Sequence, residues 1–340
     1  MSDRIRWGVV GTGLIASRFA RDLVLLDDAE VVAVGSRALA TADAFAERFA
    51  VPRRYGSYEE LAADPEVDAV YVSTPHPGHH AATRIALEGG KAVLCEKPFM
   101  LNAAEADDVI ALARERGLFL MEAMWTRFVP HMVRIREILA AGTLGRLVGV
   151  QADHGQWFAY DVEHRLFAPS LGGGALLDLG VYPVSFASSV LGTPISVTAV
   201  SDPAETGVDG QTTVVLRCAG STQAVLTTTL WAVTPCRATI VGTDARIEVD
   251  PTWYVPTSFS VLSRDDEVLE RFEEPRVGHG LRYQAAEVGR CLREGLTESP
   301  VLSLDESRSV MATMDEVRRQ IGLRYPGEDT PGLPAGGRGR

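Results

Sequence analysis

The sequence lacks the positive charge that a nucleic-acid-binding protein needs. Its 33 Lys+Arg against 45 Asp+Glu leave a formal net charge of −12, and no basic run is longer than Arg53-Arg54 or Arg318-Arg319. Proteins hold phosphate backbones with clustered Lys and Arg that release counterions. The charge balance therefore argues against a nucleic-acid partner.

Cysteines and long apolar runs are also scarce. The four cysteines lie far apart and form no CxxC pair, which argues against zinc ribbons and disulfide frameworks and predicts reduced, buried thiols. No apolar stretch approaches the ~18 to 20 residues that span a bilayer. The first ten residues, MSDRIRWGVV, carry charges with no apolar signal region after them. We therefore expect a cytoplasmic protein with no membrane partner.

The composition, 46% hydrophobic and 23% charged, is that of a folded globular protein. At ~150 residues per domain, the length predicts about two domains. We place the first at 1–124, where short β-branched runs alternate with Ala-rich helical patterns. The predicted strands are 4–10, 30–35, 67–73, 91–95 and 118–121, and the predicted helices are 14–25, 40–49, 79–88 and 103–116. This alternation predicts an α/β fold with a doubly wound parallel Rossmann sheet.

The second predicted domain, 125–325, has an α+β pattern. It contains predicted helices at 130–141, from Gly174 to 191, 281–294 and 305–321, and a predicted strand at 147–152. From 195 to 262 the sequence is strand-rich, and polar and apolar residues alternate at 212–217 and 223–231. Such alternation predicts a large, mostly antiparallel open sheet.

One face of that sheet should be exposed or covered by another chain. Because apolar sheet faces are buried against something, we expect a homodimer or higher homo-oligomer through this sheet. The Gly- and Pro-rich tail 326–340 is expected to be disordered.

A glycine motif follows the first predicted strand. Gly11-Thr12-Gly13-Leu14-Ile15-Ala16 is a GxGxxA pattern that opens the first helix. Gly11 permits a tight turn, and Gly13 lets the backbone approach a pyrophosphate at the helix N-terminus. The motif predicts dinucleotide binding, with a purely structural turn as the alternative.

The end of the second predicted strand bears on the choice of dinucleotide. A carboxylate there binds the 2′-hydroxyl of NAD, whereas an Arg accommodates the 2′-phosphate of NADP. The strand ends with Ser36 and Arg37, and no acid occurs before Asp43. A hydroxyl and a guanidinium suit phosphate oxygens. We therefore favour NADP over NAD; the alternative is that Arg37 is a solvated charge at a helix entry.

The segment Glu96-Lys97-Pro98 ends the strand 91–95 at the carboxyl edge of the sheet, where open α/β sheets bind ligands. Together with GVVGTGLIA at 8–16 and STPHPGH at 73–79, it resembles the Gfo/Idh/MocA oxidoreductase family, over nearly the whole chain to about residue 322. MWTRF at 124–128 and LGGGALLDLGVY at 171–182 are similar to the branch of dimeric dihydrodiol dehydrogenases and NADP-dependent D-xylose 1-dehydrogenases.

The resemblance implies hydride transfer between NADP and a CH–OH or carbonyl group of a sugar, polyol or cyclic trans-diol. It also implies that Thr74 and the residues after it, among them His76, border the nicotinamide ribose, while His79 starts the next helix and is a further cofactor-binding candidate. We expect Glu96 to pair locally and to line the cofactor site, with a solvated acid as the alternative. Lys97 is a cofactor-binding candidate as well. Two alternatives on the same fold are a non-catalytic nucleotide-binding regulator and an NAD-dependent, glycosidase-like enzyme.

The chain has Tyr182 where many members of the family carry His. If the chain is helical from Gly174, Asp178 and Tyr182 share one face. A tyrosine with its ordinary pKa of ~10 is a weak base at neutral pH, and an adjacent Lys97 would lower that pKa. We assign Tyr182 to proton transfer and Lys97 to electrostatic support and substrate anchoring. Asp178 is expected to orient the substrate or Lys97.

These assignments have alternatives. The roles of Lys97 and Tyr182 could be exchanged. Lys97 could also be a surface charge, Tyr182 a core aromatic residue, and Asp178 a cap for nearby backbone groups.

Other side chains complete the predicted site. Trp125, Arg127 and Phe128 follow the last Rossmann strand at the domain junction, where clefts bind ligands, so we expect them to bind substrate, with Arg127 also contacting the cofactor. Core packing explains Phe128 equally well. Phe158 is a further substrate-binding candidate, as are Trp157 and Arg165.

The dense imidazoles of 76–80 suggest a zinc site, but no clustered Cys or carboxylate accompanies them and hydride transfer needs no metal. We therefore predict no metal.

Overall fold

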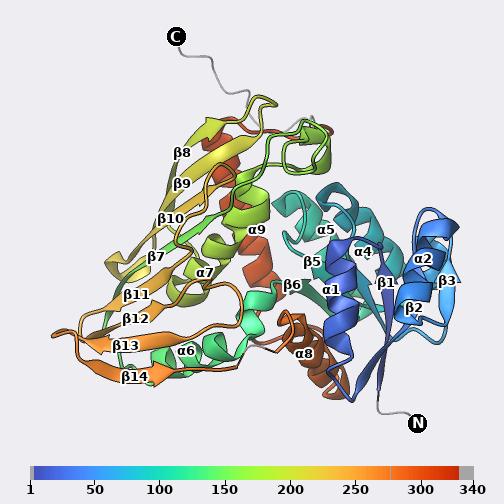
Figure 1. The fold of residues 1–340 in the computed structure, drawn as a ribbon, viewed down its shortest axis with the longest axis horizontal. Helices are drawn as coiled ribbons and strands as arrows, with labels where there is room; N and C mark the ends of the chain where they lie inside the picture. The colour runs from blue at the N-terminus through green and yellow to red at the C-terminus, as the bar shows by residue number, and fades with distance from the viewer. Residues whose placement is uncertain (1–3, 276, 329–340) are drawn as a thin grey trace.

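Two β-sheets form the framework of the computed structural model, which describes residues 4–275 and 277–328. Figure 1 shows a smaller N-terminal sheet wrapped by helices and a larger C-terminal sheet, with helices α7 (Val181–Leu191) and α9 (Leu304–Ile321) lying between the larger sheet and the N-terminal domain. The predicted combination of a Rossmann domain and an α+β domain is confirmed.

The N-terminal sheet has six parallel strands in the order β3-β2-β1-β4-β5-β6. This is the Rossmann strand order. The chain adds strands on one side of β1 as far as β3 and then crosses to the other side with β4, so the topological switch point lies between β1 and β4. The strands are β1 Ile5–Val10, β2 Ala29–Gly35, β3 Arg53–Tyr55, β4 Ala69–Val72, β5 Ala92–Glu96 and β6 Leu120–Ala123. The helices are α1 Leu14–Leu23, α2 Leu39–Phe49, α3 Tyr58–Ala62, α4 His79–Glu88 and α5 Ala103–Arg116, with a 3₁₀ turn at His76–Gly78.

The sequence patterns missed β3 and α3 because elements of three and five residues are too short to show a period. The central strands were easier to predict. Every residue of β4 and β5 is buried, as expected for parallel strands that are covered on both faces and therefore consist of apolar runs.

The C-terminal sheet has eight strands in the order β14-β13-β12-β11-β7-β10-β9-β8. Among the described strands, β7 and β10 are the one parallel pair in this sheet. The strands are β7 Leu147–Gly155, β8 Ser196–Pro203, β9 Asp209–Arg217, β10 Gln223–Thr229, β11 Ala238–Gly242, β12 Ala245–Val249, β13 Phe259–Ser263 and β14 Val268–Phe272. The remaining helices are α6 Pro130–Ala140 and α8 Leu281–Arg293, with 3₁₀ turns at Trp125–Phe128, Pro169–Leu171 and Ala219–Ser221.

Alternating side chains give this sheet two different faces. Val214, Leu216 and Leu226 point inward and are buried, and α7 and α9 pack on that side. Their neighbours Val215 and Val225 point outward and are 38% and 43% exposed. The predicted large, mostly antiparallel sheet is confirmed, and within the single chain one of its faces is exposed.

The C-terminal end of the described chain is ordered further than expected. Glu328, which we placed in a disordered tail, accepts hydrogen bonds from Arg318 of α9 and from Asn102 of the N-terminal domain. The predicted disorder is therefore wrong for 326–328, because these contacts fix the segment. The rest of the predicted tail, 329–340, lies outside the described residues.

The expectation that no apolar stretch approaches the length of a membrane span needs a correction. In the part of the chain that the structure describes, Pro169–Leu191 is long and apolar enough to cross a membrane by length and composition, with a mean hydropathy of 1.4. Its most apolar window is 83% buried inside the fold. Packing between the sheet and neighbouring helices accounts for its composition.

Candidate active site

The candidate site lies at the carboxyl edge of the N-terminal sheet. Lys97 directly follows β5, and Asp178 and Tyr182 come from the second domain. Asp178 lies in a π-helical turn, Leu176–Gly180, and Tyr182 in the first turn of α7. The site is thus built where the two domains meet.

Asp178 is held by two cations. The Lys97 Nζ atom donates to the Asp178 backbone oxygen at 2.8 Å and to its Oδ1 atom at 3.1 Å. Arg165 donates to both carboxylate oxygens, at 3.0 and 3.2 Å. Because an ammonium has three N–H groups and these contacts use two, Lys97 has a third N–H for another oxygen.

The charges of this group stabilise one another. Burial alone would raise the pKa of the Asp178 carboxyl, but Lys97 and Arg165 hold it well below its usual range. Burial lowers the pKa of the Lys97 ammonium, yet Asp178 and Tyr182 more than offset this and raise it above its ordinary value. Both groups are therefore charged at neutral pH.

Tyr182 lies against Lys97, whose Nζ atom is 4.9 Å from the centre of the phenol ring. Its hydroxyl oxygen accepts a hydrogen bond of 2.9 Å from Trp125 Nε1. Burial raises the pKa of Tyr182, and Lys97 offsets this only in part. The expectation that Lys97 lowers this pKa below its ordinary value is therefore wrong, because desolvation of the phenolate outweighs the attraction.

A π-helical turn replaces the regular helix that we predicted from Gly174. Pro183, the third residue of α7, lacks an N–H and cannot donate a helical hydrogen bond. Such turns often occur at functional sites. Although the predicted spacing of four residues belongs to an α-helix, the structure still brings Asp178 and Tyr182 together at Lys97.

Two histidines connect this centre to the loop after β4. His76 Nδ1 is 3.1 Å from the Gly172 carbonyl oxygen, and His76 Nε2 is 3.7 Å from Asp178 Oδ1. Burial lowers the pKa of His76 to about 3, so the ring is neutral at physiological pH. His79 faces the carbonyl oxygens of Pro98 and Thr74. The described residues contain no group of three or more His, Cys, Asp or Glu that could hold a metal ion.

Glu96, the last residue of β5, directly precedes Lys97 and is buried. Its carboxylate accepts a hydrogen bond from the Tyr71 hydroxyl and one of 3.1 Å from the Lys97 backbone N–H. Burial raises the pKa of Glu96 to about 7. These contacts fix the backbone from which Lys97 projects.

The glycine motif has the geometry of a dinucleotide cradle. Gly11 has a φ of +97°, and a Cβ there would lie 2.9 Å from the Ser73 carbonyl oxygen. A Cβ on Gly13, the N-cap of α1, would meet no described atom within 4 Å. The backbone of Gly13 therefore faces open space, as a bound pyrophosphate requires.

The flanking residues fit the same ligand. Leu14 is exposed and Ile15 half-buried at the start of α1. Thr74 Oγ1 is buried without a hydrogen-bond partner among the described residues, which is the state expected of a group that meets a bound ligand. The residues present therefore fit a nicotinamide dinucleotide.

Comparison with known proteins agrees with this geometry. Residues 5–124 match the oxidoreductase family with an NAD-binding Rossmann fold, and residues 132–248 match the GFO/IDH/MocA C-terminal domain. The chain belongs to the Gfo/Idh/MocA family. Its N-terminal domain is an NAD(P)-binding Rossmann domain, and the chain is an oxidoreductase of CH–OH groups.

Relatives with assigned names cover almost the whole chain. Trans-1,2-dihydrobenzene-1,2-diol dehydrogenases of Bos taurus and Homo sapiens are each 42% identical, over 95% of this chain and 98% of theirs. They confirm the resemblance to the dihydrodiol dehydrogenase branch. The 3-ketoreductase KijD10 of Actinomadura kijaniata, solved with NADP and TDP-benzene, is 29% identical with a TM-score of 0.81, over 94% of this chain and 98% of that one.

Within this Gfo/Idh/MocA fold, three predicted site residues have other contacts. The Arg127 guanidinium is buried, forms an ion pair with Glu306 of α9 at 2.8 Å, and donates to the Ser185 carbonyl oxygen. We correct its predicted cofactor and substrate roles to a role at the domain junction. Phe128 is buried in the main core, and Phe158 packs on a separate small cluster around Phe167.

Two aromatic residues of the site escaped prediction. His154 is buried, stacks on Tyr254 at 3.8 Å between ring centres, and meets the edge of Tyr182 at 5.1 Å. Burial lowers its pKa to about 3. We ended the predicted strand at 152, whereas β7 continues to Gly155. The correct end would have marked His154 as a polar residue at a strand terminus; no signal pointed to Tyr254.

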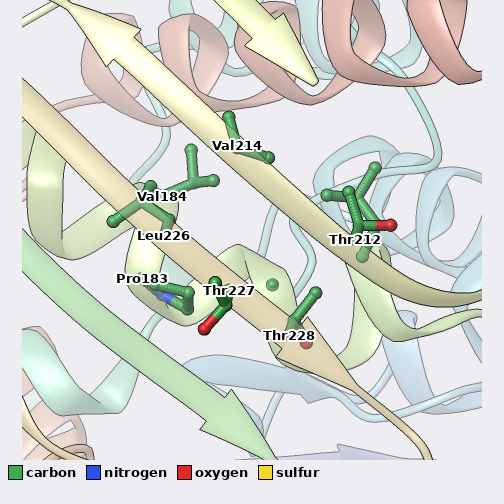
Figure 2. Close-up of a pocket in the computed structure, with 9 residues that line it drawn as sticks. Pro183, Val184, Thr212, Val214, Leu226, Thr227 and Thr228 are labelled. Atoms are coloured by element: carbon green, nitrogen blue, oxygen red, sulfur yellow. The ribbon is translucent and has the colours of Figure 1, made fainter. Parts of the chain in front are cut away.

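A small cavity lies behind the site and is not the substrate pocket. Figure 2 shows its lining residues from α7, β9 and β10, among them Pro183, Val214 and Leu226. Its volume of about 10 Å³ has room for at most one water molecule.

Proposed function

We propose that the protein is an NADP-dependent oxidoreductase that transfers a hydride between nicotinamide and a CH–OH or carbonyl group of a sugar, polyol or cyclic trans-diol. The observation that carries this proposal is the Lys97–Asp178 pair, with side chains 13% and 7% exposed, against the ring of Tyr182 at the sheet edge that also holds the glycine cradle. The names of the dihydrodiol dehydrogenase relatives and the NADP in KijD10 support the substrate class and cofactor.

The chain's own residues supply binding and proton transfer. When bound, the dinucleotide accepts or donates the hydride. Lys97 donates its free N–H to the substrate oxygen and stabilises the negative charge that develops there. Asp178, which is itself held by Arg165, keeps Lys97 in place and in its charged form.

Tyr182 moves the proton. Because its hydroxyl oxygen accepts from Trp125 Nε1, its own proton is free to point at a substrate oxygen. At neutral pH the raised pKa keeps the phenol protonated, so Tyr182 acts as the acid in carbonyl reduction. In alcohol oxidation the same oxygen receives the proton.

Arg37 supports the choice of NADP. It is exposed at the end of β2, beside Ser36, and β2 carries no acid at this end. Replacing Arg37 with Ala is expected to raise KM for NADP by about 10- to 100-fold, because a charge-assisted hydrogen bond is worth roughly 1.5–3 kcal/mol. KM for NAD should stay within about twofold. The exposed Arg48 of α2 provides the matched control, Arg48→Ala; equal effects on both dinucleotides would contradict the assignment.

The function is tested with purified protein, NADP or NAD, and a panel of aldopentoses, aldohexoses, inositols and cyclic trans-dihydrodiols. We expect the reduced-nicotinamide absorbance to rise with at least one member and more strongly with NADP. If dinucleotide binds but no compound produces net reduction, the regulator or the glycosidase-like enzyme replaces this proposal.

We also propose a homodimer through the C-terminal sheet. The outer face of the sheet exposes Val200, Val215 and Val225 on β8, β9 and β10, with Val215 directly opposite Val225, and such faces are usually covered. Light scattering should give the mass of two chains, and Val225→Lys should lower it to one; a monomeric mass for the unaltered protein would contradict the proposal.

A further inference from the structure

The turn Gly172–Gly174 leads directly into the π-helical turn that carries Asp178. Gly174 has a φ of +117°, and its N–H donates to the Leu166 carbonyl oxygen at 2.8 Å. A Cβ on Gly173 would lie 2.8 Å from the Arg165 carbonyl oxygen. The turn is therefore packed against the backbone of Arg165 on one side and is continuous with Asp178 on the other.

Asp209, at the start of β9, binds the segment just after this turn, where the π-helical turn begins. Its Oδ2 atom accepts from the Leu176 N–H at 2.7 Å and from Thr212 Oγ1 at 2.8 Å. A Cβ on Gly174 would lie 2.1 Å from Asp209 Oδ1, so only glycine leaves room for this carboxylate. The side chain is buried, 2% exposed, and its position fixes where the π-helical turn begins.

Tyr325 binds the turn itself. Its buried hydroxyl donates to the Gly173 carbonyl oxygen at 2.6 Å. The Tyr325 backbone N–H in turn donates to Glu328, which also binds Arg318 and Asn102. A residue at the C-terminal end of the described chain is thus anchored to both domains and to the active-site turn.

We propose that Asp209 and Tyr325 are positioning residues for the Arg165–Asp178–Lys97 group. Among the described residues, neither side chain forms a hydrogen bond or an ion pair with Lys97. Both act through the backbone of the turn, which places Asp178 together with its partner Arg165. The inference rests on the proposed function, in which Asp178 orients Lys97. Loss of the Asp209 or the Tyr325 hydrogen bond to this segment shifts Asp178 relative to Lys97. The glycine cradle, which lies after β1, stays unchanged.

The test compares Tyr325→Phe, Asp209→Ala and Asp209→Asn. We expect Tyr325→Phe to lower kcat by about 10-fold and Asp209→Ala by about 100-fold, since displacements of an ångström in an active site have effects of this size. KM for NADP should stay within about twofold of its original value, because the dinucleotide cradle is untouched. Asp209→Asn keeps an oxygen for the Leu176 N–H and should recover most of kcat.

Two control variants remove the same groups elsewhere. Tyr283→Phe removes a phenol oxygen from α8, and Asp265→Asn changes an exposed carboxylate between β13 and β14; both should leave kcat unchanged. An unchanged kcat in Tyr325→Phe and Asp209→Ala would overturn the proposal. So would a loss of kcat that is accompanied by an equal loss of NADP binding and of Tm.

Crystal structures of the variants separate this inference from the proposed function. A Lys97–Asp178 contact that is broken in Asp209→Ala and kept in Asp265→Asn supports the positioning role even if no substrate is turned over. A contact that is intact in Asp209→Ala overturns it, whatever the activity of the unaltered enzyme.

Discussion

Replacing Lys97 with Ala is expected to lower kcat by about 10³-fold, the size of effect seen when a donor to a developing negative charge is removed. Lys97 is the group with a free N–H beside Asp178 and the Tyr182 ring. Without it, the Asp178 carboxylate retains Arg165 as its cation and repels negative charge on the substrate oxygen. Steady-state kinetics with saturating NADP measure the loss.

Dinucleotide binding distinguishes this effect from a loss of fold. The Kd for NADPH, measured by fluorescence, should change by no more than about threefold, because the glycine cradle does not depend on Lys97. The chain contains one other lysine, Lys91, whose Nζ atom donates to the Asp64 and Val67 carbonyl oxygens away from the site. Lys91→Arg should keep full kcat. A Lys97→Ala enzyme within threefold of the original kcat would remove Lys97 from the mechanism.

Tyr182→Phe is expected to lower kcat by about 10²- to 10⁴-fold in both directions, the usual contribution of a positioned acid or base. The pH profile identifies the residue. Since burial raises the pKa of Tyr182, the phenol is protonated below pH ~10, its ordinary pKa. Reduction, which uses the protonated form, should be independent of pH up to that region and fall above it; oxidation, which uses the phenolate, should rise toward it.

Lys97 titrates in the same alkaline range, so the profile needs a second variant. Its pKa is also raised, mainly because Asp178 and Tyr182 outweigh the effect of burial. In Lys97→Arg the cation no longer titrates, and any remaining alkaline transition belongs to Tyr182. A Tyr182→Phe enzyme that keeps the transition at the original pH would show that the proton passes through another group.

The sequence was informative where function is encoded in contiguous motifs. Gly11, Gly13 and Lys97 follow strands at one sheet edge, so their proximity could be predicted from the alternation of strands and helices. A helical spacing placed Asp178 and Tyr182 on one face, and Asp178 was expected to orient the substrate or Lys97. The structure brings Lys97 and Asp178 together through a π-helical turn that the spacing did not predict.

Other features depend on packing that no local pattern records. Arg127 was expected in the site because it follows β6, but the carboxylate of Glu306, far along the chain, binds it instead. The pKa of Tyr182 depends on the balance between burial, which raises it, and several nearby charges, of which Lys97 lowers it; this balance requires the surrounding atoms to be known. Tyr254 reaches His154 from a loop between β12 and β13 that carries no motif.

The split origin of the site has an evolutionary consequence. Lys97 and the glycine cradle belong to one structural half, whereas Tyr182, Asp178 and His154 belong to the other. Mutations that change substrate preference can therefore accumulate in the C-terminal domain while the dinucleotide-binding domain stays constant. A hybrid that combines the first half of this chain with the second half of a relative should inherit its coenzyme preference from one parent and its stereochemistry from the other.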